Sequence, residues 1–261
     1  MIHSVDLLYS ISAFCVSLLV GITGVRGGFL MTPVLILVFG IHPATAVGTD
    51  LLYASATKSA GTLVHGLNQT IDWHIVGRLA AGSVPATALT LLALSSFGTY
   101  SEALQGLINA VLSAALAATA AALLFRKQVL AFYTAHVTTL ARSRTVILTV
   151  LVGAVLGILV SISSVGAGAL CATAIMFLYP QLPTARLVGT DIAHAVPLTL
   201  VAGIGHWVLG SIDWHLLGTL LAGSVPGIII GSYFSVRVPD AVARFTLAAT
   251  LLLVAGSLCK A

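Results

Sequence analysis

The chain has 261 residues, of which 59% are hydrophobic and only 7% are charged, and its mean hydropathy is +1.11. Soluble domains are about 25% charged, so this composition excludes a water-covered globular protein and predicts an integral membrane protein. The formal net charge of +4 is small and scattered, which argues against nucleic acid as a partner. The lipid bilayer is therefore the expected surrounding of the chain.

Apolar segments follow one another along the whole chain, and we expect each to form a helix. A helix that spans a bilayer needs about 20 apolar residues, and most segments reach this length. The second and seventh are short, and each follows a glycine-containing break, TGVRGG at 23–28 and SVGAGA at 164–169. The expected ranges are 5–23, 27–40, 44–66, 73–96, 101–125, 141–162, 166–179, 184–209, 214–235 and 238–258.

Polar motifs recur at a fixed offset of 141 residues, without gaps. His65 is matched by His206, and the recurring motifs are VGTD at 47–50 and 188–191, DWH at 72–74 and 213–215, and GSVP at 82–85 and 223–226. Rare polar residues coincide here, and not only the apolar background, which indicates an internal duplication. We predict a first transmembrane repeat at 1–125, a basic linker at 126–144 and a second transmembrane repeat at 145–261.

The linker at 126–144 contains four arginines or lysines and no acid. Basic loops stay on the cytoplasmic side of a membrane, so we expect this linker in the cytoplasm. If all five segments of each repeat cross, the two repeats are inverted; if the short segments only dip into the membrane, each repeat crosses four times and the repeats are parallel. Basic residues near 236–244 favour inversion. The expected fold is an all-α polytopic membrane protein of two repeats, with short glycine-broken helices near mid-membrane.

Matched breaks in duplicated membrane units are typical of secondary transporters. Irregular backbone survives in a bilayer only where it is buried in protein or lines a polar cavity. Helix N-termini that face such a cavity attract anions. The alternative is that the glycines only allow close helix packing.

Several stretches resemble the TauE/SafE family of bacterial membrane transporters, which are associated with sulfite, sulfonates and related anions. The resemblance covers about residues 10–255 and implies a multi-pass protein of the bacterial cytoplasmic membrane that transports a small sulfur oxyanion or organosulfonate. It implies no cofactor and no metal, and it leaves open the direction of transport and the coupling ion. The stretches are GVRGGFLMTPVL, AVGTD, GTDIAHAVPLTLVAGIGH, GSIDW and LLAGSVPGIIIGSYFSVRVP.

The expected anion site lies between the two glycine breaks. The planar fork of Arg26 suits an oxyanion, although this residue could instead be a topology charge at the cytoplasmic surface. Backbone N–H groups and hydroxyl groups would complete the site. The residues expected to contribute them are Gly24, Gly27, Gly28, Gly166, Gly168, Thr49, Ser163, Ser164 and Thr190.

Four ionisable residues are expected to balance charge or to couple transport to protons. Asp50 and Lys58 share one helical face, so Lys58 either pairs with Asp50 or attracts the anion. Asp191 and His194 also share a face and could share a proton. The alternative for both acids is a structural role near a helix start, where the helix dipole favours a carboxylate.

His65 and His206 are candidates for the transport pathway or for helix packing. Asp72 and Asp213 are expected to be helix N-caps. Two other functions remain open: a passive anion channel, and an intramembrane hydrolase. The hydrolase lacks a recognisable nucleophile motif, so we expect no enzyme activity, and we leave open whether the chain forms a homodimer. The hydrolase would have to be built from Ser163, Ser164, His194 and His206.

Overall fold

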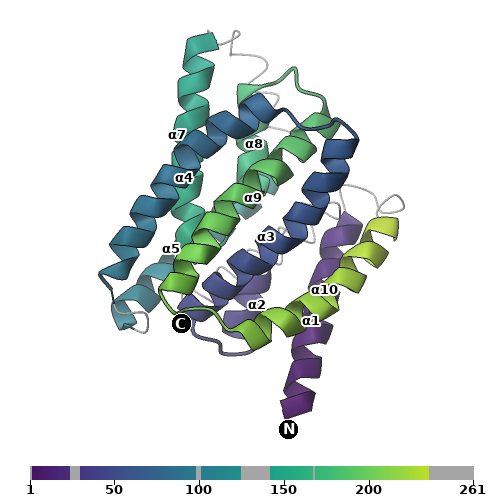
Figure 1. Cartoon of the computed structure of the whole chain (residues 1–261), viewed down its shortest axis with the longest axis vertical. Helices are drawn as coiled ribbons and strands as arrows, with labels where there is room; N and C mark the ends of the chain where they lie inside the picture. Colours follow the sequence, from purple (N-terminus) through teal and green to yellow (C-terminus); the bar gives the residue numbers. More distant parts are fainter. Residues whose placement is uncertain (1, 24–29, 98–100, 125–141, 167, 235–261) are drawn as a thin grey trace.

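The structure is a computed structural model that describes residues 2–23, 30–97, 101–124, 142–166 and 168–234. These residues form helices joined by short loops, with no strand among them. Figure 1 shows the helices as an elongated bundle. The helices are α1 (Ile2–Thr23), α2 (Met31–Leu37), α3 (Pro43–Leu67), α4 (Trp73–Ser95), α5 (Glu102–Leu124), α7 (Arg142–Ser163), α8 (Ala169–Leu178), α9 (Thr184–Val208) and α10 (Trp214–Phe234).

The helix ends lie within a few residues of the expected ranges, because the apolar segments and the turn residues between them are clear in the sequence. The predicted all-helical class is confirmed for the described residues. The expected segment at 238–258 and the break at 24–28 lie outside them.

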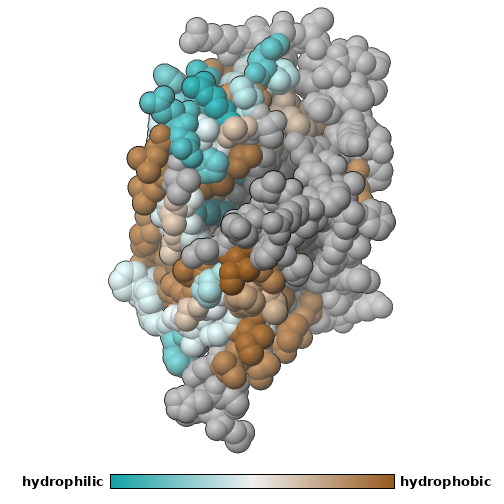
Figure 2. Space-filling view, turned by 90° about the vertical axis from the view of Figure 1, so that its right-hand side faces the viewer, coloured by the Kyte–Doolittle hydropathy of each residue, from teal (hydrophilic) through white to brown (hydrophobic). Residues whose placement is uncertain are grey.

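Four of the described helices are long and apolar enough to cross a membrane, which agrees with a membrane protein. They cover Trp73–Ser95, Glu102–Ala122, Ser143–Ser163 and Ala185–Val208. Large apolar side chains on these helices face outward, such as Leu89 and Leu92 on α4 and Leu151 on α7. Figure 2 shows apolar side chains over much of the described surface on one face, with hydrophilic ones gathered towards the upper end. The expected eight or ten crossings remain a prediction.

Two helix pairs, α1 with α10 and α4 with α7, make the most extensive contacts, followed by α3 with α9. Both leading pairs approach closely at a glycine. A Cβ atom added to Gly82 of α4 would lie 1.9 Å from the carbonyl oxygen of Val150 in α7, and one added to Gly223 of α10 would lie 2.0 Å from that of Ser10 in α1. A residue with a side chain could not occupy either position without moving the helices apart.

Helices α3 and α9 lie side by side in opposite directions (Figure 1). The hydroxyl of Thr49, near the start of α3, accepts a hydrogen bond from the backbone N–H of Asp213, just before α10, at 3.2 Å. The hydroxyl of Thr190, near the start of α9, accepts one from the backbone N–H of Asp72, just before α4, at 2.9 Å. The start of each helix is therefore fixed near the end of the other.

Candidate functional site

The second glycine-containing break separates α7 from α8. Ser164 has a φ of 58° and Gly166 a φ of 117°, both in the left-handed region, which is uncommon for a residue other than glycine. The hydroxyl of Ser163 donates a hydrogen bond to the carbonyl oxygen of Leu159 at 2.7 Å and so holds the last turn of α7. The chain then turns sharply, and this turn aims the side chain of Ser164 at α3.

The side chain of Ser164 contacts Asp50 of α3. The Ser164 hydroxyl donates to Asp50 Oδ2 at 2.9 Å, and the hydroxyl of Thr32 in α2 donates to the same oxygen at 2.5 Å. Asp50 is fully buried. Its Oδ1 atom is also buried, and it accepts no hydrogen bond within the described part of the chain. The short helix α2, the long helix α3 and the break after α7 thus meet at one carboxylate.

Lys58 links this carboxylate to the second VGTD motif. Its ammonium interacts electrostatically with both Asp191 and Asp50, and it also acts on His194. Asp191 in α9 is only 1% exposed. The sequence suggested a relation between Lys58 and Asp50 within one helix, and the structure adds a relation to Asp191 across the α3–α9 contact. The two equivalent acids therefore share one lysine.

His194 is fully buried between three helices. Its Nε2 atom shares a hydrogen bond with the Ser83 hydroxyl of α4 at 3.0 Å, and its Nδ1 atom lies 3.6 Å from the Cys171 thiol of α8. Position 53 is the equivalent of position 194 at the offset of 141, and the Tyr53 hydroxyl shares a hydrogen bond with Ser17 of α1 at 2.9 Å and lies near Ser224, the equivalent of Ser83. The contacts with Ser83 and Ser224 join α9 and α3 to the helices of their GSVP motifs.

Sequence reasoning missed Thr32, Ser83 and Cys171 as members of this region. The recurrence of GSVP already marked Ser83 as unusual, because the serine repeats with the proline. Nothing in the sequence distinguished Cys171 from a small core residue, and Thr32 sits beside a break without any motif of its own.

His206 and His65 fasten helix ends to the following loops. His206 is buried, its Nε2 atom donates to the carbonyl oxygen of Ser161 at 2.9 Å, and its Nδ1 atom shares a hydrogen bond with Ser211 at 3.0 Å. His65 Nδ1 shares a hydrogen bond with Thr70 at 2.8 Å. These contacts agree with the packing alternative, and no described contact joins either histidine to Asp50 or Asp191.

The expected hydroxyl donors separate into two groups. Ser164 reaches the Asp50 cluster, and Ser163 supports it from the end of α7. Thr49 and Thr190 lie at opposite ends of the α3–α9 pair, where their oxygens accept backbone N–H groups. Both remaining glycines that the structure describes, Gly166 and Gly168, are buried in the break. The other expected anion-binding residues, Gly24, Arg26, Gly27 and Gly28, lie outside the described residues.

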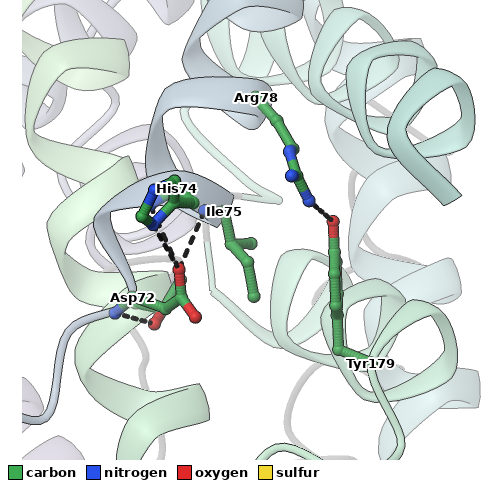
Figure 3. A network of polar contacts seen from close by, with 6 residues as sticks. Asp72, His74, Ile75, Arg78 and Tyr179 are labelled. Carbon is green, nitrogen blue, oxygen red and sulfur yellow. Dashed lines mark hydrogen bonds and ion pairs between the residues drawn. The ribbon is translucent and has the colours of Figure 1, made fainter. Parts of the chain in front are cut away.

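The start of α4 carries a second polar network (Figure 3). Asp72 accepts hydrogen bonds from the backbone N–H groups of His74 and Ile75, which confirms it as the N-cap of α4. One turn on, the Arg78 guanidinium donates to the Tyr179 hydroxyl at the end of α8 at 3.2 Å. Tyr179 also shares a hydrogen bond with Thr149 of α7 at 2.8 Å. This network fixes the far end of α8, opposite its break.

A bundle of apolar helices with two buried carboxylates, a half-buried lysine and several hydroxyls in contact with one another is typical of a membrane transporter, because ionisable residues inside a bilayer mark substrate or ion pathways. The described residues hold no group of three or more His, Cys, Asp or Glu side chains arranged for a metal ion.

The comparison with known families agrees with this class. The family model "Sulfite exporter TauE/SafE" matches residues 9–258, so the chain belongs to the TauE/SafE family of membrane transporters. The chain is 39% identical over 244 residues to "Probable membrane transporter protein YjnA" of Bacillus subtilis (strain 168), which covers 92% of this chain and 94% of the relative. It is 25% identical over 235 residues to "Probable membrane transporter protein YdhB" of the same organism, covering 88% and 91%. No solved structure matches the chain.

Proposed function

We propose that the protein is a secondary transporter that moves a small sulfur oxyanion or organosulfonate, of the kind that sulfite represents, across the bacterial cytoplasmic membrane by alternating access. The observation that carries the proposal is that the half-buried Lys58 interacts with two buried carboxylates, Asp50 and Asp191. Ionisable residues cost free energy inside a bilayer, and where they occur there they mark substrate or ion pathways. The family description names sulfite exporters, which supports the substrate class.

Alternating access requires two related conformations of one protein, and we propose that two inverted repeats provide them. The supporting observation is that contacts recur in pairs at the offset of 141. The contact of Thr49 with Asp213 mirrors that of Thr190 with Asp72, and the α1–α10 pair mirrors the α7–α4 pair. Inverted repeats place equivalent helices antiparallel, as α3 and α9 are.

The anion is proposed to bind near Lys58 and the break after α7, with Arg26 as the second cation. Within the described core two acids face one lysine, so an anion would meet net negative charge. Arg26 would bring this sum to zero, and a further cation that neutralises an acid would favour the anion still more. A proton carried by Asp191 and His194 would neutralise an acid in this way. This coupling is a hypothesis that the pH dependence of transport tests.

The hydrolase alternative needed a serine of the break beside a histidine base. Ser163 donates to the Leu159 carbonyl and Ser164 to Asp50, and neither is hydrogen-bonded to a described histidine. The passive channel differs from the carrier only in its flux, so the experiment must measure saturation and exchange.

The experiment is uptake by proteoliposomes of sulfite, thiosulfate, sulfate, sulfoacetate and taurine, with and without a pH gradient. We expect saturable uptake of at least one of these anions, and counterflow that unlabelled anion accelerates. Lys58→Gln should raise KM about tenfold, because it removes a charged partner of the anion. Arg186→Gln is the matched control, since Arg186 is an exposed cation of α9, and it should behave as wild type.

Flux that neither saturates nor exchanges would favour the channel. Equal effects of Lys58→Gln and Arg186→Gln on KM would show that Lys58 does not contribute to anion binding.

A further inference from the structure

Only one of the two carboxylate oxygens of Asp50 accepts hydrogen bonds within the described structure. Oδ2 accepts hydrogen bonds from the hydroxyls of Thr32 and Ser164, whereas the buried Oδ1 accepts no hydrogen bond from the described residues. A buried carboxylate oxygen that lacks a partner costs free energy. Such an atom points to a ligand that supplies the missing positive charge.

The oxygens around Asp50 are of the chemical kind that binds a cation. A hydroxyl group has one proton and two lone pairs, so Thr32 and Ser164 can donate to Oδ2 and still offer a lone pair each to a cation. Oδ1 supplies an anionic oxygen beside them. Hard cations take this combination of carboxylate and neutral oxygens.

The end of α7 adds to the negative potential at the same place. Helix α7 ends at Ser163, one residue before the Ser164 hydroxyl that contacts Asp50. The C-terminus of a helix carries about half a negative charge, and interrupted membrane helices use such ends to coordinate coupling cations. The left-handed φ of Ser164 lets its side chain stand next to this helix end.

The charges favour a monovalent cation. Two carboxylates, Asp50 and Asp191, interact with one lysine, Lys58, so the described core has an excess of one negative charge when all three groups are ionised. One monovalent ion neutralises it, whereas a divalent ion would replace a negative excess by a positive one. Among monovalent cations we choose sodium, because interrupted helices in membrane transporters coordinate this ion.

We propose that Asp50, Thr32 and Ser164 form a sodium site. Sodium bound there joins α2 and α3 to the break that begins α8, and it neutralises the core so that an anion can follow. As a coupling site it rests on the proposed transport function, but as a sodium site it can be tested without any anion.

The test is equilibrium binding of radioactive sodium to the purified full-length protein in lipid nanodiscs, at neutral pH and without anionic substrate. We expect saturable binding that unlabelled sodium displaces about tenfold more effectively than potassium does. Asp50→Asn should abolish binding, and Thr32→Val and Ser164→Ala should each weaken it about tenfold, the effect of one ligand. The last two variants keep the test decisive if Asp50→Asn fails to fold.

A matched control separates the site from general damage. Thr57→Val removes a hydroxyl of α3 that donates only to backbone oxygens of its own helix, those of Tyr53 and Ala54, and it should bind sodium as wild type does.

Absence of saturable sodium binding by the folded wild-type protein would overturn the proposal, as would undiminished binding in Asp50→Asn. Proton uptake at Asp50 in place of sodium binding would make this a proton site and equally overturn it. Because no anion is present, a failure of sulfite transport leaves this result standing, and a failure of sodium binding leaves anion transport untouched.

Discussion

The close approach of α4 to α7 gives a sharp prediction for Gly82→Ala. The added Cβ atom would lie 1.9 Å from the carbonyl oxygen of Val150 and 2.8 Å from the backbone nitrogen of Ala154. Ordinary contact begins near 3.4 Å, so the helices would have to separate by about 1.5 Å at this point. The obstacle is backbone, so a rotamer change cannot relieve it. Overpacking of this kind costs about 1–3 kcal/mol, occasionally more.

The same helix carries its own control. Gly77 of α4 has no atom within 4 Å of an added Cβ, and alanine favours a helix over glycine by about 1 kcal/mol. Thermal unfolding in nanodiscs, followed by tryptophan fluorescence, should therefore give a lower midpoint for Gly82→Ala and an unchanged or higher one for Gly77→Ala. The equivalent pair in α10 is Gly223→Ala, whose Cβ would lie 2.0 Å from the carbonyl oxygen of Ser10, and the open Gly218→Ala. Equal midpoints within each pair would refute the packing argument.

Three further predictions concern topology and the charged residues. A reporter fused after Trp73 should be cytoplasmic and one fused after Trp214 should be outside; identical locations would reject inverted repeats. Arg26→Ala should weaken anion binding about tenfold to a hundredfold, because charge-assisted hydrogen bonds are lost, while Arg26→Lys should restore only part. Wild-type affinity in folded Arg26→Ala would reduce this residue to a topology charge. Asp191→Asn should flatten the dependence of transport rate on pH, whereas Asp50→Asn should keep that dependence and lower affinity or folding yield. A wild-type pH profile in Asp191→Asn would end the proton hypothesis.

The sequence by itself determined the class of the protein and the extents of its helices. Composition excluded a soluble fold, and the apolar runs placed α3, α4, α9 and α10 almost to the residue, because a membrane helix needs only length and hydropathy. The N-cap at Asp72 was equally local, since a cap depends on a side chain and the N–H groups two or three residues on. The recurrence of VGTD showed that Asp50 and Asp191 are equivalent in sequence.

Only the tertiary structure decided which groups meet. Thr32 and Ser164 reach Asp50 from 18 and 114 residues away, and Lys58 stands between two acids of different helices. These contacts depend on how α3 and α9 are rotated and how closely the helices cross, and hydropathy along a chain carries no information about rotation. The sequence assigned Lys58 to the acid in its own helix because that is the only neighbour that helical periodicity can identify. The relation to Asp191 exists because α3 and α9 pack side by side in opposite directions.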